Sequence, residues 1–285
     1  MSAPLADRSE FADWIGRSSE RRDALTPRLA AEFEATLAPH LARVDGAALG
    51  AHWLLAPDVA PMRDLGGDGH PRTGLFLPKL PYPRRMWAGG ELVFRAPLRV
   101  GDEVVKTSVV EDIAFKSGAS GPLGFVTMRH TYTVGATRAI EERQDLVYRP
   151  PPAPGAAAAR PQPAKTETAE IMRAWDIATD PVMLARYSMA TFNGHRIHYD
   201  APYATGVEGY AGLVVHGPML ATLMLNVAAD ALGATPRRFR YRGLAAVICG
   251  TPFRAEARRG VGEAIETRIV TGDGVVAMAG VVEPG

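Results

Sequence analysis

The sequence predicts an α+β fold in which antiparallel strands wrap a long buried helix. From about Pro218 to Leu232 one face is apolar and alanines fill most of the other, so a helix there must be buried. Segments rich in β-branched and aromatic residues follow it. A buried helix surrounded by such a sheet is the hot-dog arrangement. The first half carries a loosely comparable strand–turn–strand order, but it has no clean counterpart of the buried helix.

A segment dominated by proline and alanine separates the two halves. The run "PPPAPGAAAARPQPAK" shows neither the period of a helix nor that of a strand, which is typical of a linker. We therefore predict an N-terminal hot-dog domain at residues 1–149, a linker at 150–167 and a C-terminal hot-dog domain at 168–285. A chain of 285 residues suits two domains of ordinary size.

The helices and strands follow from spacing and from stop signals. Leu25, Leu29, Phe33 and Leu37 recur every four residues, which predicts a first helix, and Thr26-Pro27 supplies its N-cap and first-turn proline. Residues 168–190 are expected to be rich in helix, and glycines 217 and 233 bracket the buried helix. Glycines and prolines exclude regular structure over most of 61–90. Alternating segments predict strands within residues 97–116, 124–150, 237–250, 252–259, 263–270 and 275–283.

Composition indicates which partners and which cellular compartment to expect. A net charge of +1 gives no broad electrostatic case for nucleic acid. The single cysteine, Cys249, cannot form an intrachain disulfide, which fits a reducing compartment. The start lacks the pattern of a signal peptide, and polar residues interrupt the longest apolar stretch. We therefore expect a cytoplasmic protein with no membrane or nucleic-acid partner.

The stretch "TFNGHRIHYDAP", residues 191–202, concentrates groups that can carry chemistry. His195, His198 and Asp200 are too few for a zinc site, and the chain has no Cys-x-x-Cys, so we expect no metal. No Gly-x-Ser-x-Gly is present, and Cys249 falls in an expected strand. Two interpretations stay open: turn histidines bonded to backbone, or an acid/base site. The buried helix begins at the nearby "VVHGP", and its first amides offer donors beside such a site.

At this point the chain resembles a known family. "FNGHRIHYDAPYA" followed by "GLVVHGPMLA" is similar to the hydratase-2 or MaoC-like dehydratase family of double hot-dog proteins. Within it, the motif resembles the hydroxyacyl-thioester dehydratase type 2 branch, which includes mesaconyl-C4-CoA and itaconyl-CoA hydratases. The first half also matches that branch in "HWLLAPD", "GGDGHPRTGLFLP" and "PRRMWAGGELVF", so the resemblance covers nearly the whole chain.

The resemblance implies a hydro-lyase that adds water to, or removes it from, the double bond of an enoyl-CoA. The acyl group would be a C5 dicarboxylyl group, and no cofactor is needed because CoA belongs to the substrate. His198 takes the position of the catalytic histidine and would act as general base. Asn193 falls where the family has a catalytic aspartate; it cannot act as a base, but it can orient water or the thioester. Asp200 is either a proton-transfer group or a capping carboxylate.

The resemblance also implies groups that bind the rest of the substrate. Gly217 would offer its amide to the thioester oxygen; the alternative is an ordinary helix-start glycine. His216 is expected to be structural. The phosphates of CoA, or a free carboxylate of the acyl group, require basic side chains. The candidates are Lys79, Arg84 and Arg85, with Arg237, Arg238, Arg240 and Arg242; for each one a solvated sheet face is the alternative.

Three other functions are kept as alternatives. A 3-hydroxyacyl-thioester dehydratase of fatty-acyl type uses the same chemistry on a different acyl group. A thioesterase would need an acidic side chain near the buried helix, and Glu208 and Asp230 are the nearby acids. A non-catalytic acyl-CoA-binding protein fits the replacement of aspartate by Asn193. A double hot-dog already contains a pseudo-dimer, and a further homodimer is a partner that no sequence feature determines.

Overall fold

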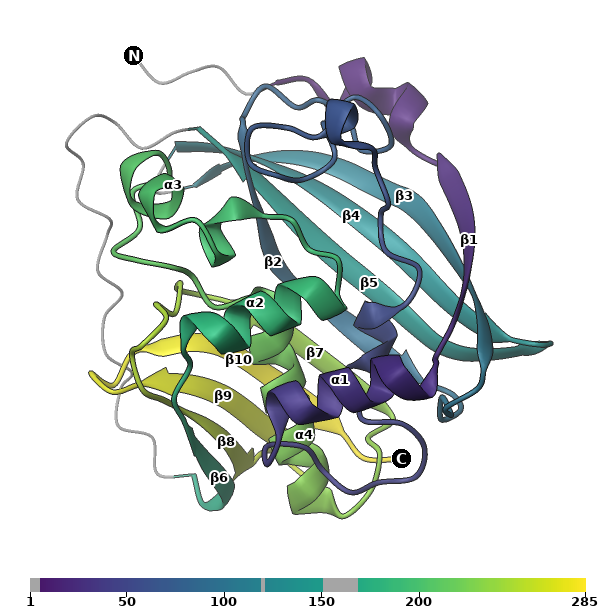
Figure 1. Ribbon diagram of the computed structural model, residues 1–285, viewed down its shortest axis with the longest axis vertical. Coiled ribbons are helices and arrows are strands. Elements are labelled where there is room, and N and C mark those ends of the chain that lie inside the picture. Colours follow the sequence, from purple (N-terminus) through teal and green to yellow (C-terminus); the bar gives the residue numbers. More distant parts are fainter. Residues whose placement is uncertain (1–5, 119–120, 151–168) are drawn as a thin grey trace.

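The computed structural model describes residues 6–118, 121–150 and 169–285. Its strands form one antiparallel sheet of ten strands, in the order β1-β3-β4-β5-β2-β7-β10-β9-β8-β6 (Figure 1). The strands are β1 (Ser18–Ala24), β2 (Arg84–Phe94), β3 (Glu103–Gly118), β4 (Gly121–Val134), β5 (Thr137–Arg149), β6 (Ile171–Ile177), β7 (Arg238–Gly243), β8 (Phe253–Arg259), β9 (Ile265–Thr271) and β10 (Val276–Glu283).

Helix α4 is the buried helix that the sequence predicts. It packs against β6, β7, β8, β9 and β10, and it lies behind α2 in Figure 1. The α-helices are α1 (Pro27–Leu37), α2 (Pro181–Ala190), α3 (Ala201–Gly206) and α4 (Gly217–Leu232). The short 3-10 helices are η1 (Arg8–Trp14), η2 (Ala51–Leu54), η3 (Met62–Asp64) and η4 (Arg196–His198). None of the described helices is long and apolar enough to span a membrane.

The two halves meet along one pair of strands. Strands β1 to β5 come before residue 150 and β6 to β10 after residue 170, and β2 pairs with β7 to join them, with Leu92 opposite Phe239. This single pairing makes one continuous sheet out of two strand sets. The expected linker lies, apart from Pro150, outside the described residues, and the domain boundaries stay predictions.

Most of the expected elements are confirmed. Thr26 caps α1 by accepting a hydrogen bond from the Leu29 amide at 3.2 Å, and Gly233 ends α4 at φ 69°. The expectation for residues 168–190 is wrong in part, because residues 171–177 form β6 at the sheet edge, opposite β8. Asp180 caps only the helix that follows. The expected strand at 237–250 ends at Gly243, and Cys249 lies in a turn.

One buried side chain ties the N-terminal half to α4. Asn226 is fully buried; its Oδ1 accepts a hydrogen bond from the Ala42 amide at 3.0 Å. Its Nδ2 donates to the carbonyls of Leu49 and Thr222 at 2.9 and 2.8 Å. Two of these bonds satisfy backbone groups of the segment that follows α1. Asn226 therefore holds that segment against α4, and removing its side chain is expected to lower the free energy of unfolding.

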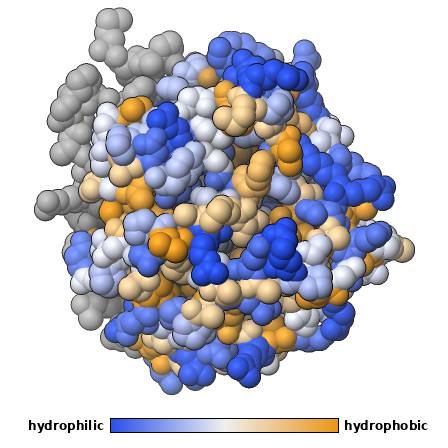
Figure 2. Space-filling view, in the orientation of Figure 1, coloured by the Kyte–Doolittle hydropathy of each residue, from blue (hydrophilic) through white to orange (hydrophobic). Residues whose placement is uncertain are grey.

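One face of the molecule is shown in space-filling form (Figure 2). Figure 2 shows polar and apolar residues interspersed on the visible face, without one continuous apolar area among the described residues there. A homodimer stays a prediction.

Asn226→Ala is expected to lower the free energy of unfolding by roughly 2–4 kcal/mol, because it leaves a buried amide and a buried carbonyl unpaired. Urea unfolding followed by circular dichroism measures the change. Asp230→Ala is the control on the same helix: it removes a half-exposed ion pair with Arg173 and is expected to cost at most about 1 kcal/mol. Equal effects of the two substitutions would contradict the role given to Asn226.

Candidate active site

His198 lies at the end of η4, buried with 5% of its surface exposed. Its Nδ1 lies 2.7 Å from the backbone oxygen of Val214. A carbonyl oxygen only accepts, so Nδ1 carries the proton and Nε2 keeps its lone pair. The fold therefore presents His198 as a base with a determined tautomer.

A second histidine connects His198 to the start of α4. The ring of His216, the residue before α4, stacks on the ring of His198 at 3.6 Å and 19°. His216 Nε2 lies 2.8 Å from Ser188 Oγ of α2, whereas its buried Nδ1 has no hydrogen-bond partner in the described part of the chain. This contact places the general-base candidate beside the amide end of α4, where a developing negative charge is stabilised.

Gly217 is the first residue of α4, and a contact across the sheet explains why it is glycine. A Cβ there would lie 2.6 Å from Cε3 of Trp87 on β2, too close for any side chain. Its φ is not positive, so close approach requires the glycine. Gly217 therefore lies directly against Trp87 of β2, and the oxyanion role of its amide stays a prediction.

A loop from the N-terminal half completes the histidine cluster. A Cβ on Gly69, at φ +88°, would lie 2.0 Å from the Gly194 carbonyl oxygen, so only glycine lets the two loops touch. The contact brings the rings of His70 and His195 to 4.5 Å, and His195 lies edge-on to His198 at 5.5 Å. Sequence reasoning missed His70, although "GGDGHP" carries the glycine that this docking needs.

Burial keeps these imidazoles neutral. It lowers the pKa of His198 to about 3, with a smaller contribution from His195. It lowers the pKa of His195 to about 4, and the positive charge of Arg85 adds to the effect. Burial also holds the pKa values of His70 and His216 well below the usual range. At neutral pH the cluster therefore offers lone pairs and N–H donors without positive charge.

The other polar residues of the motif shape the loop. Asn193 Oδ1 accepts a hydrogen bond from the His195 amide at 3.0 Å, which closes the turn before the histidines. Asp200 caps α3 by accepting from the Tyr203 amide, and it pairs with Arg196 at 2.7 Å. The Arg196 hydrogen bond is the main reason that the pKa of Asp200 is lowered. These contacts correspond to the capping alternative for Asp200.

The candidate arginines separate into different environments. Arg84 is paired with Glu208 at 2.7 Å. Arg238 and Arg240 project from β7 on the face opposite Phe239 and Tyr241, and both approach Glu283. Lys79, Arg237 and Arg242 are exposed, and Arg237 also pairs with Glu283, at 2.8 Å. Of the six arginine candidates, only Arg85 lies beside the histidines.

The acids required for a thioesterase are both engaged elsewhere. Glu208 holds Arg84, and Asp230 pairs with Arg173 at 2.7 Å. Across the described residues, no group of three or more His, Cys, Asp or Glu side chains is placed to hold a metal ion.

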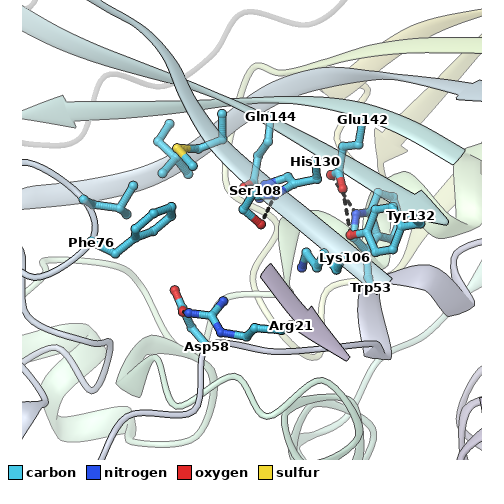
Figure 3. A pocket seen from close by; sticks show the side chains of 13 residues that line it. Arg21, Trp53, Asp58, Phe76, Lys106, Ser108, His130, Tyr132, Glu142 and Gln144 are labelled. Carbon is cyan, nitrogen blue, oxygen red and sulfur yellow. Dashed lines mark hydrogen bonds and ion pairs between the residues drawn. The ribbon is translucent and has the colours of Figure 1, made fainter. Parts of the chain in front are cut away.

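A separate polar cavity of about 160 Å³ lies against β3, β4 and β5 (Figure 3). Glu142 there accepts hydrogen bonds from Trp53 Nε1 at 2.9 Å and from the Tyr132 hydroxyl at 3.1 Å. Lys106 projects into the same space, its ammonium 5.3 Å from the Tyr132 ring centre. Trp53 packs edge-on against Trp87 at 5.5 Å, so this ring pair stands between the cavity and Gly217. Sequence reasoning missed this cluster, whose members lie on the neighbouring strands β3, β4 and β5 and on η2.

Acidification is expected to destabilise the protein below about pH 6.5. The pKa values of His52, His130 and His198 are about 3 in the folded protein against about 6.5 when unfolded, so the unfolded chain takes up protons first as pH falls. Each such histidine is expected to cost up to about 2 kcal/mol between pH 7.5 and pH 5. Urea unfolding at both pH values measures the loss.

His52→Phe is the control for this prediction. It keeps a ring against Trp53 and Tyr132 but removes one titrating group, so the loss should be smaller in the variant. Stability that does not change between pH 7.5 and pH 5 would contradict the burial of these imidazoles.

Comparison with known structures shows the fold. A MaoC-like dehydratase from Phytophthora capsici aligns with a TM-score of 0.70 at 14% identity, covering 98% of each chain. A Mycobacterium tuberculosis protein described as having a double hotdog fold aligns at 0.56 and 15% identity, over 94% of this chain and 95% of that one. The predicted double hot-dog is therefore confirmed.

Sequence comparison gives the family. The chain is 39% identical over 284 residues to the mesaconyl-C(4)-CoA hydratase of Chloroflexus aurantiacus, covering 97% of this chain and 99% of that protein. It is 28% identical to the mitochondrial hydroxyacyl-thioester dehydratase type 2 of Schizosaccharomyces pombe, covering 82% and 87%. The family model for hydroxyacyl-thioester dehydratase type 2 matches residues 50–249. With the buried histidine motif at the start of α4, these matches show that the chain belongs to the hydroxyacyl-thioester dehydratase type 2 family.

Proposed function

We propose that the protein is a hydro-lyase that adds water to the double bond of an enoyl-CoA, with a C5 dicarboxylyl-CoA such as mesaconyl-C4-CoA as substrate. The observation that carries the chemistry is His198, whose Nδ1 is bonded to Val214 and whose ring stacks on the residue before α4. The substrate class rests on the relative that matches over nearly the full length of both chains.

A residue of the candidate site can be assigned to each step of the addition. His198 Nε2 takes a proton from water, and the hydroxide oxygen bonds to Cβ. The π electrons move toward the thioester, whose oxygen is stabilised by the Gly217 amide and the positive end of α4. The protonated imidazole then returns its proton to Cα. Its lowered pKa makes it a strong acid for this last step, and dehydration is the same sequence reversed.

Asn193 cannot act as a base, and its position is consistent with His198 as the proton-transfer group. Its side-chain oxygen is occupied by the His195 amide, which determines the shape of the loop that carries His198. The single imidazole therefore has to serve both proton transfers. An aspartate in this position would add a charge beside two buried neutral histidines.

An assay with three thioesters tests the proposal. Mesaconyl-C4-CoA, itaconyl-CoA and crotonyl-CoA are incubated with the protein while enoyl-thioester absorbance and free thiol are followed. We expect absorbance to fall with mesaconyl-C4-CoA and no thiol to appear. Thiol release would indicate a thioesterase, and no reaction with these substrates or with 3-hydroxyacyl-CoA would indicate a binding protein.

His198→Ala is expected to lower kcat for hydration by about 10²–10⁴-fold, because it removes the group that carries the proton. His40→Ala is the matched control: this half-buried histidine packs on Trp175, away from the cluster, and its loss should change kcat less than about twofold. Undiminished hydration by His198→Ala would exclude the assignment.

A further inference from the structure

Arg85 lies on β2, near His70 and His195 of the histidine cluster. Its cross-strand neighbour is Tyr148 of β5, and it shares a face of β2 with Trp87, whose ring touches the start of α4. Only 10% of the Arg85 side chain is exposed. Its charge contributes to the lowered pKa of both His70 and His195, after burial. A nearly buried cation thus stands beside His70 and His195, and the His195 ring lies edge-on to that of the candidate base.

The donors of Arg85 are poorly matched within the protein. The nearest carboxylate is that of Asp68, with 3.7 Å between nitrogen and oxygen, which is longer than a hydrogen bond. The other oxygen of Asp68 accepts from the His70 amide at 3.1 Å. A buried guanidinium with so distant a counter-charge is costly unless something else binds it.

A second buried donor lies next to this arginine. The Tyr148 side chain is 1% exposed, and its hydroxyl has no hydrogen-bond partner among the described residues. Burial raises the pKa of Tyr148 more than the charge and the N–H donors of the neighbouring Arg85 lower it, so the hydroxyl stays protonated and able to donate. The guanidinium has only the distant Asp68 as a carboxylate partner, and the Tyr148 O–H has no acceptor among the described residues, so together they form a place for an anion of one or two oxygens.

The adjacent arginine provides an internal comparison. Arg84 points to the other side of β2, where it donates to the Glu208 carboxylate at 2.7 Å and to the Glu208 backbone oxygen at 3.0 Å. It also lies over the ring of Tyr210 at 5.6 Å. Arg84 is therefore satisfied by the protein itself, whereas its neighbour in sequence has only the distant Asp68 as a carboxylate partner.

We propose that Arg85 and Tyr148 form the subsite that binds the free carboxylate of the acyl group. This inference rests on the proposed function, because it assigns the residues that select a dicarboxylyl substrate. In mesaconyl-C4-CoA the free carboxylate is attached to the carbon that receives the hydroxyl group, so its partner has to lie beside the base. A substrate without that carboxylate leaves the buried cation poorly paired, so kcat/KM is lower for that substrate.

The test compares mesaconyl-C4-CoA with crotonyl-CoA, which has no free carboxylate. Arg85→Met is expected to lower kcat/KM for mesaconyl-C4-CoA by about 100-fold or more and to change that for crotonyl-CoA less than about threefold. Tyr148→Phe should give a loss of roughly tenfold with the same selectivity. Arg84→Met, which removes the same charge one residue away, should leave the ratio between the two substrates unchanged.

Lys106→Met tests the competing location. Lys106 is the cation of the cavity in Figure 3, beyond the Trp53–Trp87 pair. Selective loss of mesaconyl-C4-CoA hydration in Lys106→Met but not in Arg85→Met would overturn the inference. Equal losses on both substrates in Arg85→Met would also overturn it, since they indicate a structural role.

If the wild-type protein hydrates neither thioester, the proposed function is rejected. A binding measurement then still tests the carboxylate subsite. Free mesaconate is expected to raise the thermal unfolding midpoint of the wild-type protein and of Arg84→Met, but not that of Arg85→Met. The same rise in all three proteins, or none in the wild type, would reject the subsite.

Discussion

Helix α4 has no polar face along most of its length, so it is stable only where other parts of the chain surround it completely. Five strands and the Asn226 hydrogen bonds to the N-terminal half supply that environment. Burial of the helix leaves its first turn as the place where its unsatisfied amides can meet a ligand. The position of every group in the candidate site follows from where this end emerges, between the histidine loop and β2.

The buried histidines of the candidate site lower the stability of the protein in acid, and the same burial gives His198 the properties that proton transfer needs. Four histidines crowd at one end of α4, and burial keeps each of them neutral at the expense of stability in acid. A neutral His198 with a determined tautomer can accept a proton at Nε2, and its imidazolium is unstable enough to release it again. Arg85 adds a positive charge to the same region and thereby reinforces the neutrality of His195. A bound carboxylate would offset that charge.

The two halves contribute unequal parts to one site. The C-terminal half provides the candidate base and the helix end, whereas the N-terminal half provides His70, Arg85, Trp87 and Tyr148. Pairing of β2 with β7 and the contact between Gly69 and Gly194 bring these parts together. Neither half has the complete constellation, which gives a physical reason for two hot-dog units in one chain.

The sequence by itself determined the buried helix, its start and end, most strands and the motif from Asn193 to Asp200, because these depend on local spacing, caps and glycines. It could not assign β6, whose strand conformation depends on pairing with β8, a segment some eighty residues away. It also could not separate Arg84 from Arg85. Adjacent residues on a strand point to opposite faces, and only the tertiary structure decides that one meets Glu208 and the other the histidines.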